Sequence, residues 1–473
     1  MIPSPQLPII NFSFFPSFFP SSTIQLMTKT LNKVSFYLTA LLLAGLPFHA
    51  ILTTIFKYGL NLQNIPKLGF FITTWKEILI IIIAILFSIN FLKNRIIRLR
   101  FTTDKQTKQI TNIIIIYIIF GLSSYFWASP PSGFPQWLFG FRYDFFFLIT
   151  FLIFTFNNFN KQNIQILFNI AIYSATASII FGLIIFLINP ENLTFFGFRN
   201  DWSTWYANQA LAFCQKIENS DFCRLSGTFA GPNQYGAYLI IILPLLFYKF
   251  FQEKSKIWIF IIISALLSLF LTFSRSAWIG FIIEILLLSI IFLKQKYSNF
   301  NLKKSAIFSL LSAILIAIIF IGILKTNSEL FQRITKPEST SEHFSALFLG
   351  LETIKNHPFG LGLGTAGPAS YRFENDNSPA IITENWYLQI SVEMGIMAMI
   401  LFIVVLVTII YSNLKTTLSK FILRSLNVVE LSKLYLTIAL CGLSISALFL
   451  HSFEDSSTVL TLFTLLSLTN KLY

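Results

Sequence analysis

Long apolar runs dominate the chain, and short polar segments separate them. A helix needs about 20 mostly apolar residues to cross a bilayer. The apolar residues are continuous rather than alternating by twos, so the pattern indicates helices and not a membrane barrel. It predicts an all-α, polytopic membrane protein with about twelve transmembrane helices. These are expected at residues 34–53, 73–92, 110–128, 136–156, 165–189, 233–251, 257–274, 276–293, 305–324, 386–412, 433–451 and 456–470.

The composition supports the same class. The 473 residues are 55% hydrophobic and 11% charged, whereas soluble domains carry about 25% charged residues. We therefore expect a membrane domain over residues 34–473, preceded by an N-terminal cytoplasmic segment at residues 1–33. Residues 1–26 lack the basic region of a signal peptide, and translation is expected to begin at either Met1 or Met27.

The positions of lysine and arginine predict the orientation of the helices. Loops on the cytoplasmic side are enriched in these residues. With the N-terminus inside, 21 of the 34 lysines and arginines fall in alternate loops on the same side. Both termini are therefore expected to be cytoplasmic. Because topology accounts for much of the net charge of +14, the charge need not indicate a nucleic-acid partner.

Two long connections, residues 190–232 and 325–385, are expected on the external side. Connections of this length between helices are uncommon and often carry function, although their charges can also be simply solvated. The first holds Cys214 and Cys223, nine residues apart. Disulfides persist in an oxidising compartment, so we expect a bridge that braces Arg224.

The second connection contains an amphipathic segment. Phe344, Leu347, Phe348, Leu351 and Ile354 fall on one face of a predicted helix. That face is expected either to lie on the bilayer surface or to cover a cavity.

A glycine-rich run, GLGLGTAG (360–367), follows this helix. Glycines let backbone N–H groups approach a phosphate, but ordinary turns explain such a run more often. No spacing of histidine, cysteine, aspartate or glutamate in the chain indicates a metal site.

Cationic residues are predicted to gather at the external ends of the helices, with Glu384 nearby. Ionisable groups within membrane segments are costly and usually functional, and guanidinium groups suit phosphate recognition. A structural pairing of Arg142 with Asp144 is the alternative for part of the cluster. The predicted cations are Lys76, Arg142, Arg224, Arg275 and Arg333.

Several motifs, in this order, resemble the O-antigen ligase and polymerase family, which are membrane glycosyltransferases of the GT-C type. The resemblance covers most of the chain after residue 70. The motifs are WKEILI (75–80), GFRYDFFFL (140–148), RLSGTFAGPNQYGAYL (224–239), LTFSRSAWIG (271–280), QRI (332–334), HPFGLGLGTAG (357–367) and ENWYLQISVEMGIM (384–397).

The resemblance implies an active site on the external face, where Arg224 and Arg333 hold the diphosphate of the donor. The ligases of the family place a catalytic histidine before the asparagine of a His-Asn-x-x-Leu motif. Here Glu384 precedes Asn385, which favours a polymerase-like member with Glu384 as general base. A helix N-cap or first-turn acid is the alternative for Glu384. Further substrate-binding residues are expected to be Lys76, Arg142, Asn233, Arg275 and Asn385.

The predicted activity is therefore inverting glycosyl transfer without a metal or other cofactor. The donor would be an undecaprenyl-diphosphate-linked glycan, and the acceptor a glycan or lipid. The protein is expected in the bacterial inner membrane, in contact with membrane lipid, with a chain-length regulator as a further candidate partner. The alternative is a transporter or flippase of lipid-linked sugars, although such proteins usually contain internal repeats and midplane sites on broken helices.

Overall fold

The computed structural model describes residues 21–93, 105–157, 159–199, 210–216, 222–296, 337–374, 380–423 and 425–470. Within these ranges nine helices are long and apolar enough to cross a membrane, and two more apolar helices are shorter. The chain is therefore an all-α, multi-pass membrane protein, as predicted. The span expected at residues 305–324 lies outside the described residues.

The first half of the chain forms five long helices joined by short turns. These elements are α1 (Ser21–Gly45), η1 (Leu46–Phe48), α2 (His49–Thr54), η2 (Ile55–Gly59), η3 (Leu62–Asn64), α3 (Pro66–Lys93), α5 (Lys105–Ser123), η4 (Ser124–Phe126), α6 (Phe134–Thr155), α7 (Lys161–Phe186), α8 (Pro190–Leu193) and η5 (Thr194–Phe196).

The second half begins with a two-stranded hairpin and then returns to helices. Its elements are β1 (Gln215–Lys216), β2 (Cys223–Arg224), α9 (Pro232–Glu253), α10 (Lys256–Leu271), α11 (Arg275–Lys296), α14 (Pro337–Asn356), η6 (Ser370–Arg372), α15 (Trp386–Met394), α16 (Ile396–Ile422), α17 (Val428–Ser446) and α18 (Ser456–Thr469).

Helix α9 is the central helix of the bundle. Most of its residues are buried, and it packs against α10, α11, α17 and α18. Lipid tails are as apolar as leucine, so helices in a membrane associate through close packing rather than through the hydrophobic effect. Small residues provide that closeness here: a Cβ atom on Gly280 of α11 would lie 2.7 Å from the carbonyl oxygen of Gly442 on α17.

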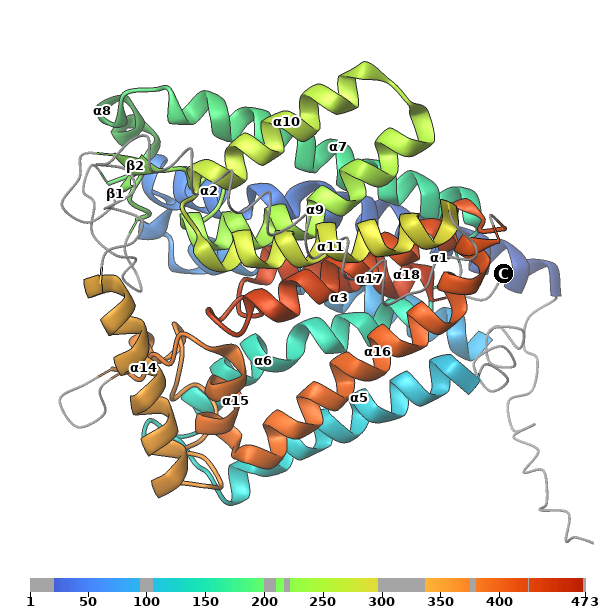
Figure 1. Ribbon diagram of the computed structural model, residues 1–473. Helices are drawn as coiled ribbons and strands as arrows, with labels where there is room; N and C mark the ends of the chain where they lie inside the picture. Colours follow the sequence, from blue (N-terminus) through green and yellow to red (C-terminus); the bar gives the residue numbers. More distant parts are fainter. Residues whose placement is uncertain are drawn as a thin grey trace, which may run out of the picture.

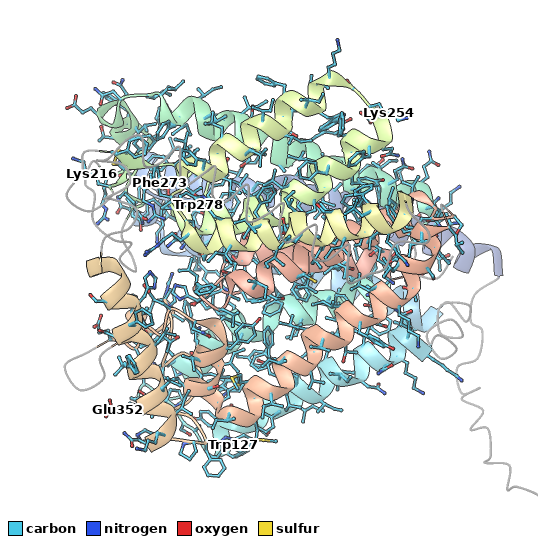
Figure 2. The ribbon with its side chains drawn as sticks, in the orientation of Figure 1. Trp127, Lys216, Lys254, Phe273, Trp278 and Glu352 are labelled. Carbon is cyan, nitrogen blue, oxygen red and sulfur yellow. A yellow bond between two sulfur atoms is a disulfide. The ribbon has the colours of Figure 1, made fainter. Side chains whose placement is uncertain are left out.

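The long helices run roughly side by side, whereas α14 crosses their ends (Figure 1). The hairpin, α2, α8 and α15 lie at the same end as α14, and the C-terminus lies at the other. Lys254, in the basic turn between α9 and α10, also lies at the far end, opposite Lys216 and Phe273 (Figure 2). The basic turn between α9 and α10 therefore lies at one end of the bundle, and the hairpin and α14 lie at the other.

The span predicted over residues 386–412 is wrong as a single helix. It is interrupted at Gly395, whose φ of 89° is in the left-handed region that favours glycine. A Cβ at this position would lie 2.7 Å from the carbonyl oxygen of Pro358. The short helix α15 therefore ends where the segment after α14 packs against it.

The amphipathic helix predicted in the second connection is α14. Ile354 is buried and packs near Leu388 of α15. Phe344, Phe348 and Leu351 remain exposed, Phe348 by 67% of its surface. The predicted apolar face is thus only partly used for packing within the described chain.

Candidate active site

A cavity of about 890 Å³ opens among the helices of the bundle. Its walls come from α2, α3, the first turns of α6, α9 and α18, and the segment between α17 and α18. Three of the predicted site residues line it, namely Lys76, Arg142 and Asn233. Concave sites of 300–1,000 Å³ with a few polar groups are the usual form of small-molecule sites.

Lys76 and Arg142 form a charge-paired cluster on the cavity wall. Lys76 is 1% exposed, and its Nζ lies 2.7 Å from His49 Nε2 and 3.5 Å from Glu77 Oε1. Arg142 donates from Nε to the same Glu77 oxygen at 2.9 Å. A single carboxylate between two cations supplies the pairing that a buried charge requires.

The alternative considered for part of the cluster, a pairing of Arg142 with Asp144, is therefore wrong. Arg142 bonds to Glu77 of α3, while Asp144 lies in the interior near Glu393 and Glu454. Residues two apart on a helix point in different directions, so Arg142 and Asp144 face different neighbours.

Arg224 on strand β2 and Arg275 at the start of α11 form a second cationic cluster. Arg224 donates from Nε to the Thr272 carbonyl at 2.8 Å and from a terminal nitrogen to Asn233 Oδ1 at 2.7 Å. Burial and the positive charge of Arg275 lower the pKa of Arg224 to about 10. The field of a second cation favours an anion beside Arg224.

The predicted disulfide between Cys214 and Cys223 is confirmed, with a Cα–Cα distance of 5.2 Å. It closes the β1–β2 hairpin, in which Gln215 pairs with Arg224. The next residue, Leu225, donates from its backbone to the Leu271 carbonyl at the end of α10. The backbone of Arg224 is therefore fixed on both sides.

Glu384 precedes α15 and contacts His343 of α14. Its carboxylate lies against His343 Nδ1, and its side chain is 30% exposed. The backbone φ of Glu384 is 49°, which is uncommon for a residue with a side chain and often accompanies functional positions.

Asn385, and not Glu384, is the N-cap of α15. Its side-chain oxygen accepts from the Leu388 backbone at 3.0 Å, and its amide donates to the Leu448 carbonyl at 2.9 Å. The alternative role considered for Glu384 therefore belongs to its neighbour. The capping bonds occupy both ends of the Asn385 amide and fix the position of the preceding carboxylate.

His451 is a cavity residue that the sequence patterns did not single out. It lies between α17 and α18 and lines the cavity. Burial and the nearby His343 lower its pKa to about 4. His343 thus lies near both Glu384 and His451, and so connects the cavity wall to the predicted base. The sequence around His451 does not indicate that this side chain lines a cavity.

Arg372 is a second residue that was not selected from the sequence. It belongs to η6 and lines the cavity. Its guanidinium lies 4.7 Å from the centre of the Phe139 ring, and that of Arg142 lies 5.3 Å from the Tyr143 ring. The cavity wall therefore combines cations with aromatic faces.

The glycine-rich run binds carboxylates of the protein itself. Backbone N–H groups of Gly364 and Ala366 donate to Glu393 Oε1 at 3.0 and 3.2 Å. That of Ala369 donates to Glu454 Oε1 at 2.9 Å. Burial and the charge of Asp144 raise the pKa of Glu454. These N–H groups therefore hold the loop in place, which supports the turn interpretation over a phosphate site.

The remaining predicted residues have different positions. Arg224, Arg275, Glu384 and Asn385 do not line the cavity, although Asn233 lines it and also binds Arg224. Arg333 lies outside the described residues. Within the described ranges, no group of three or more histidine, cysteine, aspartate and glutamate side chains is arranged to hold a metal ion.

Comparison with known families gives one match. Residues 259–403 match the model of the O-antigen ligase family (Wzy_C). The matched segment includes Arg275, Glu384 and Asn385, whereas Arg224 precedes it. A search of curated proteins gave no match. This match supports the resemblance to the O-antigen ligase and polymerase family, and it places an O-antigen ligase domain at residues 259–403.

Proposed function

We propose that this chain, with its O-antigen ligase domain, transfers glycan from an undecaprenyl-diphosphate-linked donor to a hydroxyl group of an acceptor glycan or lipid. The reaction takes place at the external face of the bacterial inner membrane, with both termini cytoplasmic. The position of the basic Lys254 turn at the end opposite α14 supports this orientation. A chain-length regulator is a candidate partner.

The donor diphosphate binds beside Arg224 and Arg275, with Arg333 joining from the second long connection. The single observation that carries this proposal is the environment of Arg224, which is bonded only to neutral groups in the described chain and lies within the field of Arg275. The hydrogen-bond partners found for Arg224 are a carbonyl and an amide, both neutral. An anionic ligand would relieve the repulsion, and bidentate guanidinium groups match phosphate oxygens.

Glu384 acts as general base in an inverting, metal-independent transfer. The carboxylate takes the proton of the acceptor hydroxyl as its oxygen attacks the anomeric carbon. The bond from this carbon to the diphosphate oxygen breaks, and the diphosphate leaves with the electron pair. The arginines stabilise the charge that develops on the leaving group.

A polymerase-like activity is favoured over ligation to a lipid acceptor. The carboxylate of Glu384 stands where the ligases of the family have histidine. The cavity next to the site offers aromatic faces and polar groups to a glycan acceptor. A transporter or flippase of the same lipid-linked sugars remains the second hypothesis, and detergent solution separates the two because it contains no compartments.

The test is transfer by the purified protein in detergent, using lipid-linked glycan extracted from cells that make it. The wild-type protein should lengthen the glycan, whereas a transporter should not. Arg224→Ala should reduce transfer by about 10²-fold or more, because removing one donor to a developing charge has effects of this size.

Lys256→Ala is the control, since Lys256 is an exposed cation in the basic turn at the opposite end. It should leave transfer unchanged. Normal polymer length and yield from a correctly inserted Arg224→Ala protein would reject the assignment.

A further inference from the structure

His451 occupies an unusual position in the cavity wall. Its Nδ1 atom is buried and has no hydrogen-bond partner among the described residues, although the residue lines the cavity of about 890 Å³. A buried polar atom is nearly always satisfied by a partner, and an exception indicates a missing ligand or a functional role. Leaving such a group unpaired costs about 1–3 kcal/mol.

The imidazole is neutral at physiological pH. Its pKa is lowered to about 4 by burial and by the nearby His343. A neutral imidazole has one N–H donor and one acceptor nitrogen. This pair suits a hydroxyl group, which both donates and accepts. It suits a phosphate poorly, because phosphate oxygens prefer donors that carry positive charge.

The surroundings of His451 also favour a carbohydrate. The cavity is lined by the aromatic rings of Phe139, Tyr143 and Phe146 and by polar groups of several helices. Aromatic faces pack against the apolar faces of sugar rings, and polar groups at the edge bind hydroxyls. The cations in this wall have partners within the protein. Lys76 and Arg142 share the Glu77 carboxylate. Lys57 lies over the Tyr58 ring and Arg372 over the Phe139 ring.

We propose that His451 binds a hydroxyl group of the acceptor glycan inside the cavity, and so places that sugar beside His343 and Glu384. The inference rests on the proposed glycosyl transfer and adds a residue and a location for the acceptor. The diphosphate and the acceptor sugar then occupy separate places, joined at Asn233, which lines the cavity and binds Arg224.

The experiment compares two substitutions at one position in the purified full-length protein. His451→Phe keeps the ring shape and loses both hydrogen-bonding nitrogens, whereas His451→Gln keeps one donor and one acceptor. His357→Phe is the control, since His357 is exposed after the end of α14 and does not line the cavity. Transfer is measured against the concentration of lipid-linked glycan. Binding of sugar-free undecaprenyl diphosphate is measured separately by thermal shift.

His451→Phe should raise the apparent KM for the glycan by about tenfold or more, the effect of losing one buried hydrogen bond. His451→Gln should raise it by no more than about threefold, and His357→Phe should not change it. The affinity for undecaprenyl diphosphate should stay within about twofold in all three, because this probe lacks the sugar.

Two outcomes overturn the inference without affecting the proposed function. An unchanged KM in a folded His451→Phe protein would exclude the hydroxyl contact. A parallel loss of undecaprenyl diphosphate binding would instead assign His451 to the diphosphate. The proposed function fails separately if Arg224→Ala transfers glycan normally. Size-exclusion profiles of each variant show whether the protein is folded. If His451→Phe does not fold, the KM of His451→Gln is compared with that of the wild type instead.

Discussion

The two cationic clusters, Lys76 with Arg142 and Arg224 with Arg275, differ in what surrounds their charges. On the cavity wall, Glu77 lies between Lys76 and Arg142, so one carboxylate offsets much of the positive charge. Beside the hairpin, Arg224 is held by neutral groups and lies within the field of Arg275. The first cluster is a paired structural element, and the second is suited to an anion.

This difference shows that the number of cations in a region does not measure its capacity to bind phosphate. Both clusters consist of arginine or lysine residues. A buried charge with a partner contributes little further attraction for a ligand, because its field is already compensated. The neutral partners of Arg224 orient its guanidinium without cancelling its charge.

Glu77→Gln, in the paired cluster, should produce the largest effect. Removing one partner of a buried ion pair destabilises a protein by about 3–5 kcal/mol, because Lys76 and Arg142 would lose their carboxylate. Unfolding in mixed detergent micelles measures this loss. Glu352→Gln, on the exposed side of α14, should change stability little. A loss below about 1 kcal/mol for Glu77→Gln would show that the cluster is not a structural pair.

Removing the disulfide should have a smaller effect, confined to the cluster of Arg224 and Arg275. Changing Cys214 and Cys223 to serine opens a loop of about ten residues, which corresponds to about 2–3 kcal/mol. Glycan transfer by this double variant should also fall, because Arg224 directly follows Cys223. Cys441→Ser, at the free cysteine, is the control. Full transfer by the double variant would show that the hairpin does not position Arg224.

A third effect should come from pH, at the neutral histidine near the paired cluster. The unfolded chain binds a proton at His451 below about pH 6.5, but the folded protein does so only below about pH 4. Stability should therefore fall as the pH decreases from 6.5 to 4, because the unfolded state binds more protons in this window.

His451→Gln should lack this pH-dependent contribution to stability. The difference in stability between the wild type and His451→Gln at each pH therefore measures the contribution of His451. Burial raises the pKa values of the neighbouring Glu454 and Asp455, so their contribution has the opposite sign and is common to both proteins. Thermal unfolding in detergent at several pH values provides the measurement. Identical pH profiles for the two proteins would contradict the neutral state of His451.

The positions of the spanning helices could be predicted because about 20 apolar residues in a row have few alternatives. The interruption at Gly395 could not, since a glycine within an apolar run does not reveal its φ angle. It depends on the packing of the Pro358 segment against α15. The disulfide was predictable because only one pair of cysteines shares the expected external segment.

The individual cations could also be predicted, but their partners could not. Arg142 and Asp144 are close in sequence and yet bond to different helices. Their neighbours are determined by how α3, α6 and α15 pack, which no local pattern encodes. His451 and Arg372 were not predicted for the same reason. Both line a cavity that forms only when helices distant in sequence pack together.

The bridge between Cys214 and Cys223 also links maturation to location. It forms only where thiols are oxidised, and it locks the strand that carries Arg224. A chain that has been inserted but not yet oxidised would lack this lock. Preparations in strong thiol reductants would therefore contain a protein with a loosened hairpin, even when every helix is correctly inserted.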